Sequence, residues 1–458
     1  MTNDMTHKQE QYDIVIVGAG VGGICAALAA ARLRRSVLLL EEMAEIGGTG
    51  VHSAVSLICA FRDNNGRPIN NGIHRELFPQ AYTHGKGLFE VEETVPTYDE
   101  KQLKASYQAL LEAEPGITVR TGHKVTGVES KDGSIVSLSA ESVNGETSRV
   151  GGRVFLDATA DGNLSALAGA ECQMGREEDG KMQTATVTFK MVGFDPAKLF
   201  NPRITTWGGI HSLRKELTVY YQQMKEAGGT NNPRPSVLCF PYPDGRGILF
   251  NSTAVTNIDP TDAESVSAGM REGTEQAVQL AEAVKRHPAF AQAQVEFIAP
   301  KLGVREGRRV VGDYMLTADD CLSGRAFDDM VAACAYSLDI HDPLGGGAKL
   351  VKIGGPGYYH IPYRSLIAKG WTNLLLSSRC ISGSHEAHSS YRVMSGVSAI
   401  GEASGTAAAL ALWRNAGDVR DVPAAQIRYV LQAGGQFVEG RVEKVSLKQP
   451  PAEPGIKR

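Results

Sequence analysis

The stretch IVIVGAGVGGICAALAA, residues 14–30, decides the fold of the first part of the chain. Residues 14–17 form a short, continuous apolar run before a glycine, which is typical of a buried parallel strand. Gly18, Gly20 and Gly23 then give the spacing GxGxxG. In this pattern the first glycine permits a tight turn, the second lets a pyrophosphate approach the backbone, and the third lets the next helix pack closely. We expect that helix to run to about Arg35, with its N-terminal N–H groups facing the bound anion.

The second expected strand, SVLLLEE at residues 36–42, ends in two acidic residues. A carboxylate at this point of a βαβ unit accepts hydrogen bonds from the ribose hydroxyls of an adenosine. Glu41 is the first acid after the apolar run and is the preferred candidate, with Glu42 as its competitor. An acid here also disfavours a ribose that carries a 2′-phosphate, as in NADP.

Length and composition limit the classes of protein to which the chain can belong. A chain of 458 residues predicts two closely packed domains. The formal net charge of -4 disfavours nucleic acid as a partner. The apolar runs are too short to span a membrane, and residues 1–13 carry no signal-peptide pattern. The seven cysteines are scattered without a CxxC pair, so we expect no disulfide framework, no metal site and a cytoplasmic location.

Three further stretches bear on whether the dinucleotide is NAD or FAD. EIGGTG, residues 45–50, allows a loop to pass close to an extended ligand. VFLDATADGNLSALAGA, residues 154–170, predicts a third strand, a turn of small residues and a helix. NLLLSSRCISGS at 373–384 predicts another buried strand, and SGVSAIGEASGTAAALAL at 395–412 predicts a helix of small residues. A strand and helix that return near the C-terminus favour FAD, because its flavin ring extends beyond the adenosine half of the site.

On these stretches the chain resembles the FAD-dependent oxidoreductase family, within the glutathione-reductase-like superfamily of two-domain flavoproteins. The other stretches that carry the resemblance are GREEDGKMQ (175–183), REGRRVVGDYMLT (305–317), LDIHDPLG (338–345), YYHIPYRSLI (358–367) and RCISGSHEAHSSYRVMSGVSAIGEASGTAAA (379–409). Together they reach from one end of the chain to the other. One departure is ATADGN at 158–163, where much of the family has ATGDGD, so that Ala160 and Asn163 replace a glycine and an acid.

The resemblance implies an α/β fold with a Rossmann-like FAD-binding domain, built on a parallel sheet, and an inserted α+β substrate or cap domain. We expect the FAD-binding domain to comprise residues 1–174 and 366–446, the insertion to be 175–365, and residues 447–458 to form a flexible tail. The strands expected inside the insertion are 182–192 and 236–243, and the amphipathic helices expected there are 213–229 and 261–288.

The resemblance also implies which residues would hold FAD. Gly18, Gly20 and Gly23 would cradle the pyrophosphate, and Glu41 would bind the adenosine ribose. The residues implied at other parts of the cofactor are Gly48 and Thr49 along the ribitol or pyrophosphate, Val125 at the adenine, Asp161 near the pyrophosphate, and Val393, Met394 and Ser395 at the flavin N1/O2 edge. The last placement has an independent reason, because reduced flavin carries negative charge at that edge and a helix N-terminus stabilises an anion.

Four clusters compete for the catalytic role, since dehydrogenation by a flavin needs a base for the substrate proton. They are His385, His388, Tyr391 and Arg392; His341 and Asp342; Tyr359, His360, Tyr363 and Arg364; and Arg305, Arg308 and Arg309. We select His385 as the base, His360 and Tyr363 to orient the substrate, and Arg392 to supply charge. The arginines at 305–309 form either a surface ion-pair cluster or a clamp for an anionic substrate, because Arg can bind a carboxylate through two bonds.

These features predict an FAD-dependent oxidoreductase that transfers a hydride between a small polar substrate, anionic or hydroxylated, and flavin N5. The alternatives are a non-redox flavoprotein, such as an isomerase or hydro-lyase, and a flavin monooxygenase that uses O2. The sequence holds no second GxGxxG and no CxxxxC pair, so the electron donor or acceptor is expected to be a separate, unidentified molecule. We expect non-covalent FAD, with attachment to His52 as the alternative, and the sequence is compatible with a homo-oligomer.

Overall fold

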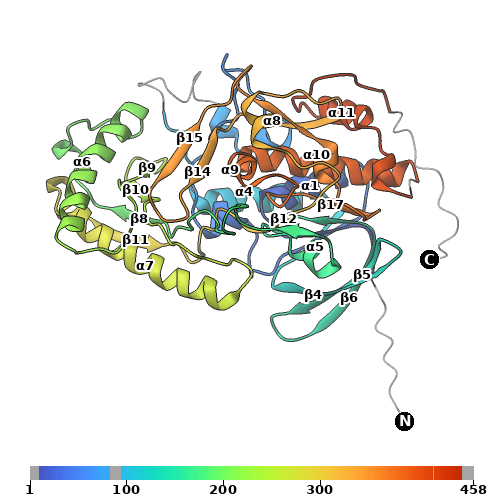
Figure 1. Ribbon diagram of the computed structural model, residues 1–458, viewed down its shortest axis with the longest axis horizontal. Coiled ribbons are helices and arrows are strands. Elements are labelled where there is room, and N and C mark those ends of the chain that lie inside the picture. The colour runs from blue at the N-terminus through green and yellow to red at the C-terminus, as the bar shows by residue number, and fades with distance from the viewer. Residues whose placement is uncertain (1–9, 83–93, 416, 446–458) are drawn as a thin grey trace, which may run out of the picture.

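Residues 14–17 of the quoted stretch lie in a strand of a seven-stranded sheet, of which Figure 1 labels β4, β5, β6 and β17. The structure is a computed structural model that describes residues 10–82, 94–415 and 417–445; the predicted tail at 447–458 lies outside these ranges. The strands pair in the order β3-β2-β1-β6-β5-β4, and β17 also pairs with β6. Their bounds are β1 Glu10–Val17, β2 Val37–Leu40, β3 Ile117–Arg120, β4 His123–Lys131, β5 Ser134–Ser142, β6 Thr147–Asp157 and β17 Leu374–Leu376. The pairs β3–β2, β2–β1, β1–β6 and β6–β17 are all parallel, which confirms the predicted Rossmann-like α/β fold.

The strand, turn and helix predicted from the glycine spacing are confirmed, with small shifts at their ends. The helix α1 (Val21–Arg32) follows β1 and is buried from Val21 to Ala31. It ends at Arg32 rather than at the expected Arg35, because Arg34 adopts the left-handed backbone conformation, with φ of 61°. The strand β2 covers less than the predicted 36–42 and stops at Leu40, so Glu41 follows it directly.

The two helices α1 and α10 (Met394–Trp413) pack directly against each other. Small residues on both helices permit this approach. A Cβ on Gly401 would lie 2.2 Å from the carbonyl oxygen of Gly22, and a Cβ on Gly405 would lie 2.2 Å from that of Ala26. The helix predicted at 395–412 is therefore confirmed, and its glycines are required by its contact with the first helix of the fold.

A second sheet and two long helices form a separate layer, at the end of the molecule away from β4 and β5 (Figure 1). The sheet has the order β11-β8-β10-β9. The bounds are β8 Phe189–Val192, β9 Cys239–Pro241, β10 Gly247–Phe250, β11 Gln294–Ile298, α6 Trp207–Glu226 and α7 Ala263–Lys285. The two amphipathic helices predicted at 213–229 and 261–288 are confirmed. Their apolar faces and the sheet share a hydrophobic core of their own, built mostly from residues 189–293.

The remaining elements surround the first sheet and the helix α10. They are α2 Gly48–His52, α3 Ile73–Leu77, α4 Glu100–Glu112, α5 Asn163–Ala168, β7 Cys172–Gln173, β12 Arg309–Val310, α8 Ala318–Leu322, β13 Met330–Cys334, β14 Leu338–His341, β15 Ala348–Val351, β16 Tyr359–Pro362, α9 His385–Tyr391 and α11 Ala424–Ala433, with 3-10 turns at Pro79–Tyr82, Pro196–Lys198, Pro288–Phe290, Tyr363–Leu366 and Val419–Asp421. No helix in the described ranges is both long enough and apolar enough to cross a bilayer.

The packing bears on where the inserted domain ends. The sequence predicts an insertion over 175–365. Most buried apolar side chains between Val310 and Leu366, however, belong to the core that contains α1 and α10, not to the core of the second sheet. We therefore propose that the inserted cap domain ends near Val304.

The contact between α1 and α10 can be tested by a single methyl group. We expect Gly401→Ala to lower the free energy of unfolding by about 2 kcal/mol or more, because the added Cβ meets backbone that cannot rotate away. This loss would occur although Ala favours a helix interior over Gly by about 1 kcal/mol. Gly417→Ala is the control, since a Cβ there meets nothing within 4 Å. Equal stability of the two variants in chemical denaturation would contradict this packing.

Glu402, on the same helix, makes the free energy of unfolding depend on pH. Burial raises the pKa of this carboxyl from an ordinary 4.5 to about 8, and its oxygen accepts hydrogen bonds from Ile73 N at 3.1 Å and Gln436 Nε2 at 2.9 Å. A carboxyl with a raised pKa holds its proton more tightly in the folded state. The folded state therefore loses stability as the pH rises from about 4.5 to about 8.

The variant Glu402→Gln cannot ionise, so its free energy of unfolding should fall less over this pH range than that of the wild type. Urea denaturation at a series of pH values measures the difference. Glu112→Gln removes the same charge at an exposed position and serves as the control. Parallel pH profiles for the wild type and Glu402→Gln would show that Glu402 is ionised in the folded protein.

Candidate functional site

Glycine stands at the three positions of the first turn for different structural reasons. Gly18 has φ of 103°, and a Cβ there would lie 2.7 Å from the backbone of Ala158. A Cβ on Gly23 would lie 1.9 Å from the oxygen of Gly18. At Gly20, in contrast, a Cβ would meet only the Cα of Gly48, at 3.8 Å. Protein packing thus requires glycine at the first and third positions, whereas the second glycine leaves a space, as close approach of a pyrophosphate demands.

Several helices begin without a capping side chain, α3, α5 and α11 among them, and three of the uncapped helices, α1, α2 and α10, begin where the cofactor is expected. The N-terminal residues of α1 and α10 follow Gly20 and Val393, and neither helix has a side chain that accepts from its first N–H groups. The helices α4, α6, α7 and α9 are each capped by an Asp, Thr or Ser side chain. Uncapped N–H groups and the positive end of the helix dipole favour an anion, which fits the pyrophosphate at α1 and the flavin edge at α10.

The two acids after β2 differ in their surroundings. Glu41 is buried at the turn, where its carboxylate accepts from Ala19 N at 2.7 Å and from Met43 N at 3.0 Å. Glu42 is half-exposed and lies 3.7 Å from the ammonium of Lys301. The arrangement therefore supports Glu41, rather than Glu42, as the candidate for the ribose.

The other candidate cofactor residues lie around the same turn. Gly48 is the first residue of α2 and has a positive φ of 55°. A Cβ on Gly48 would lie 2.8 Å from the Cα of Gly20. Thr49 is the next residue of the helix. The start of β4 lies against Glu41, whose carbonyl accepts from His123 N at 2.9 Å, and Val125 follows two residues later on this strand. His52 is buried in α2, and its Nε2 lies 2.9 Å from the carbonyl of Glu45.

Two predicted residues already have protein partners. The carboxylate of Asp161 pairs with the guanidinium of Arg379 at 2.8 Å. Ser395 donates from its hydroxyl to the carbonyl of Cys59 at 2.5 Å, which ties the first turn of α10 to the loop after α2. The sulfur of the neighbouring Met394 lies 3.3 Å from the hydroxyl of Tyr98.

His385, the predicted base, is buried at the start of α9 and bonded to a carboxylate. Its Nδ1 lies 2.8 Å from Oε1 of Glu306, and Nη1 of Arg309 donates to the same oxygen at 2.6 Å. The backbone N of Gln183 donates to the other oxygen, Oε2, at 3.0 Å. Because a carboxylate only accepts hydrogen bonds, Nδ1 carries the hydrogen and Nε2 holds the free lone pair.

A second histidine–carboxylate pair lies beside the first. Nε2 of His341 is 3.3 Å from Oδ2 of Asp339, which also accepts from Arg392 Nη2 at 3.3 Å. Gln183 connects the two pairs, because its side-chain oxygen accepts from the backbone N of His341 at 3.2 Å. Burial, followed by repulsion from Arg305, lowers the pKa of His341 to about 3, so this imidazole is neutral near pH 7.

His388 lies one turn after His385 and has a different role. It is fully buried, and neither ring nitrogen has a hydrogen-bond partner in the described part of the chain. Burial and the neighbouring arginines lower its pKa well below the ordinary value. His388 is thus neutral, with its ring edge-on to Tyr391 at 5.4 Å between centroids.

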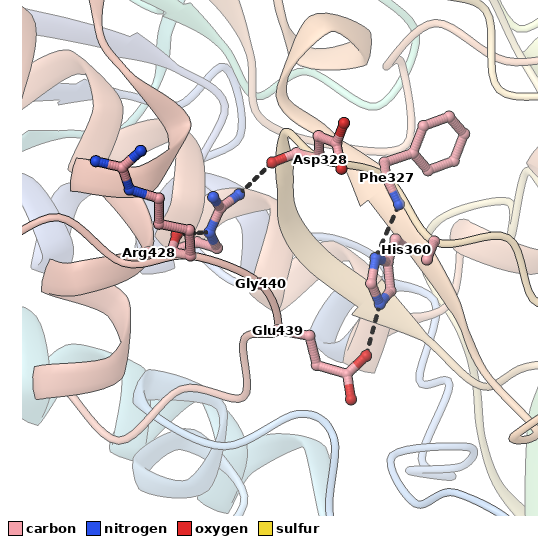
Figure 2. Close-up of a pocket in the computed structure, with 8 residues that line it drawn as sticks. Phe327, Asp328, His360, Arg428, Glu439 and Gly440 are labelled. Atoms are coloured by element: carbon pink, nitrogen blue, oxygen red, sulfur yellow. Dashed lines mark hydrogen bonds and ion pairs between the residues drawn. The ribbon is translucent and has the colours of Figure 1, made fainter.

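The structure does not bring His360 or Tyr363 to this cluster. Figure 2 shows His360 between the backbone N of Phe327, at 3.1 Å, and the carboxylate of Glu439, at 2.9 Å, beside a cavity of about 480 Å³. Tyr363 donates to the carbonyl of Val419 at 2.8 Å. Strand alternation explains the separation, because the preceding residue on β16, Tyr359, points the other way and bonds to Ser390 in α9.

Sequence reasoning missed three members of the cluster: Gln183, Glu306 and Asp339. Glu306 lies inside the REGRR motif, where only the arginines were selected. Asp339 could have been found from alternation, because residues 339 and 341 of a strand point to one face. The selected Asp342 instead stabilises the turn after β14, accepting from the backbone N of Leu344 and Gly346. No local signal marks Gln183, whose partners come from distant parts of the chain.

The cysteines of the chain are buried or partly buried. All seven cysteines lie in the described ranges and are free thiols, and burial raises the pKa of the Cys59 thiol to about 12. A thiol with this pKa is protonated near pH 7 and is a poor nucleophile. Within residues 10–82, 94–415 and 417–445, no three His, Cys, Asp or Glu side chains are placed to share a metal ion.

Comparison with known proteins places these features in a family. A family model described as FAD dependent oxidoreductase matches residues 13–431. No curated protein matches the chain. Similar solved structures include a geranylgeranyl bacteriochlorophyll reductase-like protein from Thermoplasma acidophilum, with 12% identity over 93% of this chain and 84% of that chain and a TM-score of 0.44. They also include a flavin-dependent brominase, with 11% identity over 92% of this chain and 83% of that chain and a TM-score of 0.45.

The close approach of Gly48 to Gly20 gives a test of the cofactor site. We expect Gly48→Ala to weaken FAD binding by about tenfold or more, equal to about 1.4 kcal/mol, because the new Cβ pushes α2 away from the turn. Gly180→Ala is a matched control, since Gly180 is also left-handed, with φ of 70°, but faces open space. Flavin absorbance per mole of purified protein, followed by titration with FAD, gives the affinity. Equal loading of the two variants would place the cofactor elsewhere.

Proposed function

Because the chain belongs to the FAD dependent oxidoreductase family, we propose that it transfers a hydride between a small polar substrate and the flavin ring. FAD supplies the hydride-accepting or hydride-donating atom, flavin N5, when it is bound. The residues proposed to hold it are the turn from Gly18 to Gly23, Glu41, Gly48 and the first turn of α10. The space at Gly20 and the two uncapped helix ends fit such a cofactor.

The pair of His385 and Glu306 is the observation that carries the proposal. Glu306 is almost completely buried and fixes the imidazole through Nδ1, so Nε2 is the nitrogen that can take a proton from the substrate. Arg309 and Gln183 in turn hold Glu306 in place. The helix α9 that carries His385 ends directly before α10, whose first turn is the proposed flavin contact.

His341 is the other histidine of the cluster with a carboxylate partner, but it fits the role of base less well. A group with a pKa of about 3 has little affinity for a proton near pH 7. We propose that His341 binds the substrate as a neutral hydrogen-bonding group. Arg392, which holds Asp339, is proposed to supply positive charge beside it.

The partners and location follow from the same features. The proposed electron donor or acceptor is a separate molecule, because the sequence holds a single GxGxxG turn. The substrate is a small molecule, proposed to enter between the FAD-binding domain and the cap. The seven unpaired thiols support a reducing compartment, and we propose the cytoplasm.

The proposal is tested by mixing the FAD-loaded enzyme without oxygen with small alcohols, amines, hydroxy acids and amino acids. Loss of the visible absorption of oxidised flavin reports hydride transfer from the substrate. Dithionite serves as the control for a reducible flavin. Product formation with an unchanged flavin spectrum and no acceptor would replace this function by the non-redox alternative, and formation of a hydroxylated product with O2 would favour the monooxygenase.

His385→Asn tests the proposed base. With any substrate that reduces the wild type, the rate of flavin reduction should fall by about 10²–10⁴-fold, because the variant lacks a proton acceptor at this position. FAD affinity should be unchanged. His211→Asn, at an exposed position of α6 outside the cluster, is the control and should reduce at the wild-type rate. Rapid-mixing absorbance measures all three proteins, and an unaltered rate in His385→Asn would assign the base to another group.

A further inference from the structure

Three arginine side chains meet where the cap faces the FAD-binding domain. Arg234 precedes β9 of the cap, Arg305 follows the cap sheet, and Arg392 ends α9. Arg234 and Arg305 are only 8% and 6% exposed, and the side chain of Arg392 is 14% exposed. Burial of three guanidinium groups in one region needs compensating negative charge, since an isolated buried charge is strongly unfavourable.

The described residues supply only part of that charge. Arg305 donates to two neutral oxygens, the carbonyl of Thr184 at 2.5 Å and Oδ1 of Asn251 at 3.3 Å. Arg234 donates from Nε to the carbonyl of Ser236 at 3.2 Å. Neither arginine has an ion-pair partner within 4.0 Å in the described part of the chain, although Asp339, the nearby carboxylate, pairs with Arg392.

The guanidinium group of Arg305 lies close enough to those of Arg392 and Arg234 to be repelled by both. Burial lowers the pKa of Arg305 to about 9, and repulsion from Arg392 and Arg234 adds to this effect. The attraction of Asp339 opposes the shift without cancelling it. Asp339 is shared among Arg392, His341 and the hydroxyl of Tyr336, which donates to it at 2.8 Å. One carboxylate therefore faces three positive charges.

Two further donors in this region have no acceptor. Nε2 of Gln183 and Nε of Arg392 are buried, and neither makes a hydrogen bond within the described ranges. Gln183 is 4% exposed and contacts both histidine pairs of the proposed active site. Buried donors of this kind are normally satisfied, so they point to acceptor oxygens that a ligand brings.

We infer that Arg234, Arg305 and Arg392, with the side-chain amide of Gln183, bind a carboxylate of the substrate. This inference rests on the proposed function and narrows its substrate class to small carboxylic acids. Guanidinium groups suit the role because their planar N–H pairs match the two oxygens of a carboxylate. Binding would place the oxidisable carbon of the acid near the imidazoles of His341 and His385, which Gln183 connects.

Binding can be measured without turnover, so it is separable from the proposed hydride transfer. The oxidised, FAD-loaded enzyme is titrated with acetate, propionate and succinate, with the uncharged acetamide, propionamide and succinamide, and with inorganic phosphate. The flavin absorption spectrum reports occupancy, and the thermal unfolding midpoint reports it independently. We expect at least one carboxylate to bind about tenfold or more tightly than its amide. Equal affinity of acids and amides, or binding of phosphate alone, would overturn the inference.

Variants at Arg305 separate ligand binding from structure. We expect Arg305→Gln to weaken binding of that carboxylate by about thirtyfold or more, and Arg305→Lys to give an intermediate loss, since it keeps the charge without the planar fork. Arg271→Gln, on an exposed part of α7, is the control. Because Arg305 forms no ion pair with the described residues, Arg305→Gln should not lower the unfolding midpoint. A lower midpoint with unchanged carboxylate affinity would show a structural role and contradict the inference.

The two proposals fail in different ways. If carboxylates bind but none reduces the flavin, the carboxylate site stands and hydride transfer from these acids is excluded. If neutral alcohols or amines reduce the flavin while carboxylates neither bind nor react, the proposed function stands and the carboxylate site is wrong.

Discussion

The contact between α1 and α10 is the constraint on which the site depends. The backbone of Gly22 lies where a side chain on Gly401 would be, and Ala26 stands in the same relation to Gly405. Such closeness holds the N-terminal turn and the C-terminal helix in one rigid unit. Both uncapped helix ends, at Gly20 and Val393, therefore keep a fixed spacing. The proposed FAD site needs this spacing, because its pyrophosphate and ring contacts are proposed at these two helix ends.

The segment that follows the cap sheet carries two charged residues of the proposed site. Glu306 and Arg305 are neighbours in sequence but point to different partners: the first holds His385, and the second lies among neutral oxygens. Burying a guanidinium that has no ion pair among the described residues, beside two others, lowers stability. A protein that keeps such an arrangement gains from it when an anion binds, which is the usual compromise between stability and activity at an active site.

Much of the fold could be predicted from local sequence, whereas the hydrogen-bond partners of the candidate catalytic residues could not. Two patterns identify their elements because each allows a close approach to the backbone. They are the glycines at 18, 20 and 23 and the small residues at 395–412. The ends of elements were less predictable, since Arg34 enters a left-handed turn with no glycine to mark it. Choosing among histidines needs more than local sequence, because the tertiary partners Glu439 and Glu306 are what distinguish His360 from His385.

The buried histidines near the cap show how partners assign roles. Within the described residues His388 has no hydrogen-bond partner for either nitrogen, and His341 shares its carboxylate with Arg392 and Tyr336. Burial and neighbouring arginines keep both neutral, so they can donate or accept hydrogen bonds but hold no extra proton near pH 7. His385 alone combines a carboxylate at Nδ1 with a position at the start of the helix that leads into α10. The base is therefore defined by what fixes its ring and by where its helix ends, and not by the presence of histidine in the sequence.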